Sequence, residues 1–212
     1  MPVISHLKKW ENYFPDNAKY IPDESNQPLS LEPKTLSLDM KAGTVEVSLA
    51  IPIPKTTEFN PWLMDFINYI LGKPPNSIFF KLIREKYALA YDARTLGFHY
   101  TDYSLFMVYL GITDALCVEK TISLAEEILT NITSYLNEEK LELYKRAYVE
   151  QYWMNSDHLL NFSRSILYYA LSNTPLHPEE LLRNIQTITL TDIEIFLKNY
   201  IKPSKFSKII IR

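Results

Sequence analysis

Residues 77–91 change from a helical to an extended hydrophobic pattern within one short segment, and this change limits how the surrounding chain can fold. Four apolar residues recur there at helical spacing: Ile78, Phe79, Leu82 and Ile83. Arg84 lies off this apolar face, and an extended run begins at Leu89 and includes Tyr91. We therefore predict a short amphipathic helix, capped by Asn76 or Ser77, that leads directly into a strand.

Arg84 and Tyr91 lie seven positions apart, on either side of this predicted junction. A guanidinium group is always charged and offers five N–H donors in a fixed geometry, and a phenol both donates and accepts hydrogen bonds. If the two side chains converge on one cleft, they can hold a peptide backbone. The alternative is an exposed helical arginine next to a tyrosine that faces the core.

The hydrophobic pattern of the remaining chain predicts both strands and helices. Residues 35–41 and 44–53 alternate between apolar and polar side chains, which predicts two half-buried strands joined as a hairpin at Ala42 and Gly43. Further strands are predicted at 89–100, 103–112 and 206–211. Helices are predicted at 60–71, 113–136, 137–154, 156–171, 178–188 and 191–200. This order indicates an α+β fold in which several helices cover an antiparallel sheet.

The length of 212 residues suits one domain. The first 34 residues contain five prolines and are predicted to form a linker or interdomain segment: Pro2, Pro15, Pro22, Pro28 and Pro33. Regular structure is expected only from residue 35, so we place the domain at 35–212.

Charge and hydropathy exclude several classes of partner. The net charge of −3 gives no electrostatic reason to expect nucleic acid or a membrane surface as a partner. No run of apolar residues is long enough to span a membrane, and the N-terminus lacks the apolar core of a signal peptide. These features favour a cytoplasmic location. Cys117 is the single cysteine, so no internal disulfide is expected, and its place on the apolar side of a predicted helix indicates a buried structural thiol.

The segment around Arg84 resembles a signature of the insulinase/pitrilysin family of zinc metallopeptidases. The residues that match are Arg84, Glu85, Lys86, Leu89, Ala90 and Tyr91. They match the C-terminal, non-catalytic type of domain in that family. The resemblance implies an insulinase-like or processing-peptidase-like half, in which Arg84 and Tyr91 bind a peptide substrate. It also implies a partner: a zinc-bearing family half, on the same polypeptide or on a separate subunit.

The metal motif of the catalytic half is absent from this sequence. That motif, H-x-x-E-H, places two zinc-binding histidines one helical turn apart, with a glutamate that activates water. The four histidines of this chain do not follow that spacing: His6, His99, His158 and His177. We therefore expect no catalytic residue and no cofactor in this chain, with zinc in the partner half, and we predict that the chain alone is inactive.

Two other functions fit the same residues. Lys73, Pro74 and Pro75 replace a glycine-rich turn that family members often have, which favours a non-proteolytic scaffold or peptide-binding module of the same fold. Exposed aromatic residues such as Tyr100 and Tyr103 instead allow an α+β domain that self-associates. A free edge of the predicted strand 92–100 is a further place where a peptide can add to the sheet.

Overall fold

The computed structural model describes residues 32–40, 43–54, 59–73, 75–100, 102–171 and 178–212. The chain divides into two compact units, Met1–Ser30 and Leu31–Arg212, and all of these residues belong to the second unit. The fold below is that of the second unit alone.

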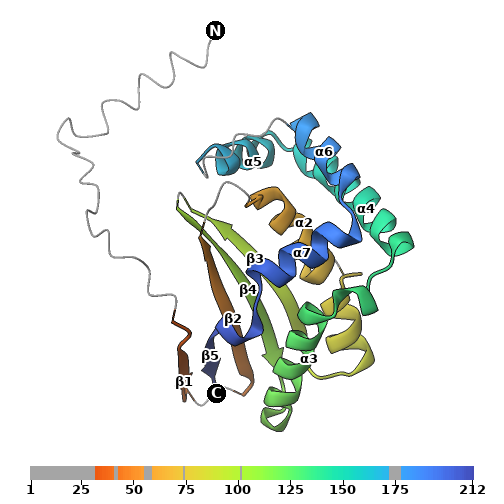
Figure 1. Cartoon of the computed structure of the whole chain (residues 1–212). Coiled ribbons are helices and arrows are strands. Elements are labelled where there is room, and N and C mark those ends of the chain that lie inside the picture. Colours follow the sequence, from red (N-terminus) through yellow and green to blue (C-terminus); the bar gives the residue numbers. More distant parts are fainter. Residues whose placement is uncertain (1–31, 41–42, 55–58, 74, 101, 172–177) are drawn as a thin grey trace, which may run out of the picture. The chain divides into compact units, whose positions relative to one another are not determined.

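A five-stranded sheet forms the base of the unit, with helices packed against one of its faces (Figure 1). Its strands are β1 (Thr35–Leu38), β2 (Val45–Pro54), β3 (Asp92–His99), β4 (Tyr103–Ile112) and β5 (Ser207–Ile211). Their order across the sheet is β1-β5-β2-β4-β3. The β1–β5 pair is parallel and the other three pairs are antiparallel. The predicted α+β class is therefore confirmed, with a mixed, mostly antiparallel sheet.

The strand pairing corrects one prediction and confirms another. The segments 35–41 and 44–53 do contain strands, but these strands do not form a hairpin because β5 lies between β1 and β2. All four residues of β1 are exposed, so this strand is not half-buried as predicted. The predicted turn residue Ala42 lies outside the described residues. The segments 89–100 and 103–112 contain the predicted strands, and these pair as the antiparallel hairpin of β3 and β4. A local pattern indicates a strand, and distant segments then decide which neighbour it pairs with.

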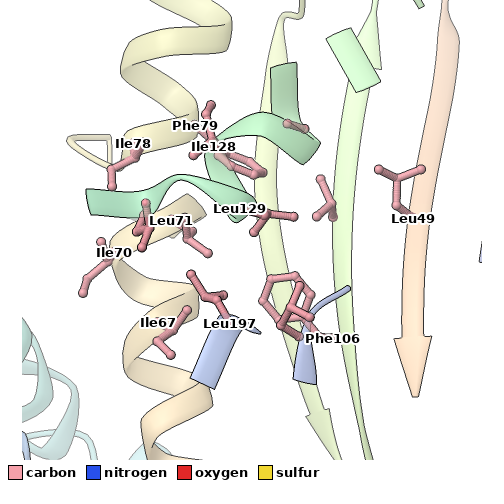
Figure 2. Close-up of a cluster of buried hydrophobic side chains, with 14 of the residues drawn as sticks. Leu49, Ile67, Ile70, Leu71, Ile78, Phe79, Phe106, Ile128, Leu129 and Leu197 are labelled. Atoms are coloured by element: carbon pink, nitrogen blue, oxygen red, sulfur yellow. The ribbon is translucent and has the colours of Figure 1, made fainter. Parts of the chain in front are cut away.

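Alternation along β2 separates the two faces of the sheet. Val45, Val47 and Leu49 are buried on the helix side, whereas Glu46 and Ser48 are partly exposed on the opposite side. Figure 2 shows Leu49 and Phe106 of the sheet among the buried side chains that the helices contribute. These helices are α2 (Pro61–Gly72), α3 (Val118–Thr130) and α7 (Leu190–Tyr200). The other face of the sheet remains open among the described residues, and the candidate site lies there.

Helix α2 is apolar around most of its circumference because it has neighbours on two sides. It packs against β3 on one side and against α4 (Glu138–Ser156) on the other. On the α4 side, the rings of Phe66 and Tyr69 lie edge-on to Tyr148, with centroids 5.3 and 5.1 Å away. An all-apolar helix is expected where both faces are covered.

The remaining helices differ from their predicted bounds mainly at residues 113–136. The single predicted helix is divided into a 3-10 turn (Ala115–Cys117), α3, and a second 3-10 turn (Ile132–Ser134). The chain continues through α5 (Leu159–Leu171) and α6 (Pro178–Thr187), and a 3-10 turn at Pro203–Lys205 precedes β5.

Cys117 is half-buried at the boundary between the first 3-10 turn and α3, and is therefore more exposed than predicted. None of the helices within the described ranges is long and apolar enough to cross a membrane.

Candidate functional site

The segment that contains Arg84 forms a π-helix, η1 (Phe80–Lys86), where the sequence predicts a short amphipathic helix. The backbone N–H of Tyr87 donates to the carbonyl oxygen of Leu82, five residues earlier, at 3.0 Å. Ile83 is fully buried and anchors this segment in the core, while Arg84 is exposed. Such single-turn π-helices often occur at functional sites.

The helix start is not capped as predicted. The hydroxyl of Ser77 is buried and has no hydrogen-bond partner among the described residues, and no side chain caps η1. The backbone carbonyl of Asn76 instead accepts a hydrogen bond from the Tyr144 hydroxyl of α4 at 2.7 Å. The start of the segment is therefore held by tertiary contacts.

The junction between η1 and β3 depends on an unusual backbone conformation at Ala88. This residue has φ of +49°, in the left-handed region that side chains with a Cβ rarely adopt. The N–H of Leu89 donates to the carbonyl oxygen of Ile83 at 2.9 Å, and that of Tyr91 donates to Gly111 at 2.8 Å. Between Ala88 and Tyr91 the chain thus passes from η1 to its pairing with β4. Non-glycine residues held in this region cluster at functional sites.

Tyr91 lies on the open face of the sheet, with its ring directly over Gly111 of β4. A Cβ atom at Gly111 would lie 2.5 Å from the ring carbon Cζ of Tyr91, so only glycine leaves room for the ring. The Tyr91 hydroxyl donates to Oε1 of Glu46 in β2 at 2.5 Å. The residue as a whole remains 42% exposed.

Glu46 is the centre of a small hydrogen-bonded cluster on this face. The Tyr109 hydroxyl of β4 donates to its Oε2, and the Thr44 hydroxyl donates to its Oε1 at 3.2 Å. The guanidinium of Arg94 lies 4.8 Å from the centre of the Tyr109 ring, and its Nη2 lies 2.9 Å from a carboxylate oxygen of Asp92. We call Glu46, Tyr91 and Tyr109, with Thr44 and Arg94 beside them, the Glu46 cluster.

The pKa values of the cluster follow from these contacts. Partial burial raises the pKa of Glu46, but hydrogen bonds from Tyr109, Tyr91 and Thr44, together with the charge of Arg94, lower it by more. The net result is a pKa below the ordinary value of 4.5. The hydrogen bond to Glu46 raises the pKa of Tyr91 and, more strongly, that of Tyr109. At neutral pH the cluster therefore contains an ionised carboxylate and two protonated phenols.

Arg84 and Tyr91 both face solvent but do not touch each other. The Arg84 guanidinium lies 4.8 Å from the centre of the Phe80 ring. Within the described ranges, no hydrogen bond or ring contact joins Arg84 to Tyr91. The alternative of a tyrosine that faces the core does not describe Tyr91, which is 42% exposed. The convergence of Arg84 and Tyr91 on one ligand remains a prediction.

A separate cavity of about 630 Å³ lies beside β3 and is lined by residues of α2, α4 and α5. The side chain of Asn68 borders it and is buried, and neither its Nδ2 nor its Oδ1 has a hydrogen-bond partner among the described residues. Neither Arg84 nor Tyr91 lines this cavity. Arg84 and Tyr91 are therefore exposed residues that do not belong to this cavity.

The described residues do not provide a metal site. They contain no group of three His, Cys, Asp or Glu side chains placed to hold a metal ion. His99 is buried, with Nδ1 2.6 Å from Ser104 Oγ and Nε2 3.2 Å from Asp65 Oδ1. His6 and His177 lie outside the described residues. The donor set of the described chain thus does not fit a tetrahedral zinc ion.

Sequence reasoning missed Glu46, Tyr109 and Arg94 as parts of the site. The alternation of residues 44–53 placed Glu46 on the polar side of a strand, but only the register brings the three residues together. Glu46 pairs with Gly111 in β4, and Arg94 pairs with Tyr109. No spacing within a single strand could have indicated this cluster.

Comparisons with known proteins identify similar sequences and folds. A family model described as "Peptidase M16 inactive domain" matches residues 4–148. No curated protein sequence is similar enough to count as a match.

Among solved structures, a protease from Helicobacter pylori is 16% identical with a TM-score of 0.76, covering 87% of this chain and 45% of its own. A peptidase M16 inactive domain from Pseudomonas fluorescens is 18% identical with a TM-score of 0.68, covering 85% and 43%. An inactive peptidase domain from Bordetella parapertussis is 15% identical with a TM-score of 0.62, covering 79% and 92%.

These structures share the fold at low sequence identity. The chain spans less than half the length of the Helicobacter and Pseudomonas chains, and nearly the whole length of the Bordetella domain.

Proposed function

This chain belongs to the peptidase M16 family as one of its inactive domains, and on that premise we propose that it is the substrate-binding half of a zinc-dependent metalloendopeptidase. The zinc comes from a second half that carries H-x-x-E-H, on the same polypeptide or on a separate subunit. Arg84 and Tyr91 hold the backbone of the peptide substrate while the zinc-bearing half cleaves it.

The observation that carries this proposal is the exposure of both signature side chains next to a rigid support. Arg84 is solvent-accessible at the end of η1, and Tyr91 is fixed between Gly111 and Glu46 while remaining 42% exposed. Both groups are exposed, and neither lines the cavity beside β3. A second domain that contacts Arg84 and Tyr91 would form a substrate cleft with them.

The role of the two residues is positioning and electrostatic assistance. Arginine stays protonated in proteins, so Arg84 can donate hydrogen bonds to a peptide carbonyl but cannot transfer a proton. Donors placed near the reacting carbonyl stabilise charge that develops there in the transition state. Proton transfer and water activation belong to the zinc-bearing half.

The test is a cleavage assay in which this chain is combined with a zinc-bearing half encoded by the same genome. A fluorescence-quenched decapeptide serves as substrate. We expect cleavage only when both halves are present, and Arg84→Ala and Tyr91→Phe should each lower kcat/KM by roughly 10- to 100-fold. Wild-type rates in both variants would refute the assignment of these residues.

Matched control substitutions separate this effect from general damage. Arg183 is exposed and Tyr135 is half-buried, and both lie outside the Glu46 cluster. Tyr135 donates to Glu127 at 2.8 Å in a pair that resembles Tyr91 and Glu46. Arg183→Ala and Tyr135→Phe should leave kcat/KM within about twofold of wild type.

A non-proteolytic scaffold with the same fold is the second candidate. The replacement of a glycine-rich turn by Lys73, Pro74 and Pro75 favours it, although Pro74 lies outside the described residues. The likeness to a chain from a structure of Complex III2 from Candida albicans (12% identical, TM-score 0.69) favours it too. This alternative predicts a stable complex with a partner protein, and that complex cleaves no peptide. Sedimentation detects the complex, and the same cleavage assay shows whether it is active.

A further inference from the structure

We propose that Glu46 is a positioning residue that accepts a hydrogen bond from the Tyr91 hydroxyl. The phenol oxygen of Tyr91 then accepts a hydrogen bond from a backbone N–H of a bound peptide. The choice of a peptide as ligand rests on the proposed function. The orientation of the Tyr91 hydroxyl rests on the geometry alone.

The direction of the hydrogen bond follows from the chemistry of the two groups. A carboxylate only accepts hydrogen bonds, and a phenol has a single O–H proton to donate. The Tyr91 hydroxyl lies 2.5 Å from Oε1 of Glu46, within the range of a short bond between a hydroxyl and a carboxylate. While this bond is formed, Tyr91 has no proton left for a substrate carbonyl.

The rest of the Glu46 cluster prevents a different arrangement. Tyr109 donates to the second carboxylate oxygen, so both oxygens of Glu46 are engaged by phenols. Arg94 lies over the Tyr109 ring and its charge favours the ionised form of the carboxylate. Gly111 fixes the plane of the Tyr91 ring by leaving no other space beneath it. An ionised Glu46 whose two oxygens both accept hydrogen bonds has no proton to donate to Tyr91.

In this arrangement the two signature residues form hydrogen bonds of opposite direction with the peptide. Arg84 has donors only, so it suits a peptide carbonyl, whereas Tyr91 accepts and suits a peptide N–H. Together they match the two hydrogen-bonding groups of an extended peptide backbone. The site should therefore discriminate against a peptide that lacks an N–H at the contacted position, as proline or an ester linkage does.

The first test measures the titration of Tyr91 by NMR on the full chain labelled with ¹³Cζ-tyrosine. We expect the pKa of Tyr91 to lie above its ordinary value in the wild type and to fall in Glu46→Gln. In Tyr109→Phe the pKa of Tyr91 should remain raised, because its bond to Glu46 persists. A Tyr91 titration that does not change in Glu46→Gln, or that returns to normal in Tyr109→Phe, would overturn the assignment.

The matched control is the Tyr135–Glu127 pair on the surface of the helical layer. Its hydrogen bond raises the pKa of Tyr135 to about 12. Glu127→Gln should lower that pKa and leave the Tyr91 resonance unchanged, which shows that the readout reports the local carboxylate.

The second test replaces single amides of the quenched decapeptide by esters, which removes one N–H at a time. In the assembled enzyme, an ester at one position should lower kcat/KM by about 10-fold, and this loss should disappear in Tyr91→Phe. Equal sensitivity in wild type and Tyr91→Phe at every position would contradict an N–H contact. If no zinc-bearing half gives cleavage, the proposed function fails, while the NMR titration still decides the role of Glu46.

Discussion

At the scale of residues, the site depends on one carboxylate that controls two phenols. Glu46 accepts hydrogen bonds from Tyr91 and Tyr109, and these bonds keep its pKa below 4.5 and raise theirs. The cluster is assembled on three adjacent segments, β2, β4 and the residues that enter β3. The charge state of Glu46 therefore affects the stability of the sheet where these three segments meet.

Glu46 should make stability depend on pH in the acid range. Because folding lowers its pKa, its contribution is fully present above the unfolded value of 4.5 and is lost as the pH falls through the folded value. The difference in unfolding free energy between wild type and Glu46→Gln, measured by urea denaturation, should be constant near neutrality and shrink below about pH 4. A difference that grows towards acid pH would contradict the lowered pKa.

At the scale of elements, close contact between α2 and β3 determines where the signature segment lies. Gly72 ends α2 against the backbone of β3, and the Thr95 hydroxyl donates to the carbonyl oxygen of Asn68 at 3.1 Å. The strand that follows η1 is thus held by the helix that precedes it. This contact explains why a glycine occurs there: it is needed for close packing.

Gly72→Ala should strongly destabilise the fold. The added Cβ would lie 2.1 Å from the backbone nitrogen of Thr95 and 2.7 Å from backbone atoms of Arg94, which cannot move aside without displacing β3. We expect a loss of about 3 kcal/mol, measured by urea denaturation. Gly43→Ala is the matched control, since a Cβ there meets nothing within 4 Å, and it should change stability by less than about 0.5 kcal/mol. Equal stability of the two variants would show that α2 can shift.

At the scale of the whole molecule, the described residues of the second unit place their core on one side of the sheet. The buried apolar residues form one cluster between the sheet and the helices (Figure 2). The opposite face carries the Glu46 cluster along with exposed apolar side chains such as Leu36, Phe98 and Ile209. A surface of this kind is suited to contact with a further protein domain.

The proposed pairing with a zinc-bearing half predicts where zinc will be found. Because the described residues place no three metal-binding side chains together, the purified chain should retain well below one equivalent of zinc after dialysis. Its complex with the zinc-bearing half should contain one zinc ion for each H-x-x-E-H motif. Metal analysis by mass spectrometry checks both values, and stoichiometric zinc in the isolated chain would refute the assignment.

Several features were determined by local sequence alone. The period-two alternation of residues 44–53 predicted β2, and the pattern of residues 84–91 carried the family signature. These properties depend on neighbouring residues, so they can be read without knowing the fold. The same is true of the β3–β4 hairpin, whose strands are joined by a short turn.

Only the tertiary structure decided the strand order and the environment of Tyr91. β5 comes from the end of the chain and separates β1 from β2, and Glu46 reaches Tyr91 across 45 residues of sequence. Both depend on the register between strands that are distant in the chain. Hydrogen-bond pairing across a sheet is a property of neighbours in space, and no local pattern within one strand specifies its partner.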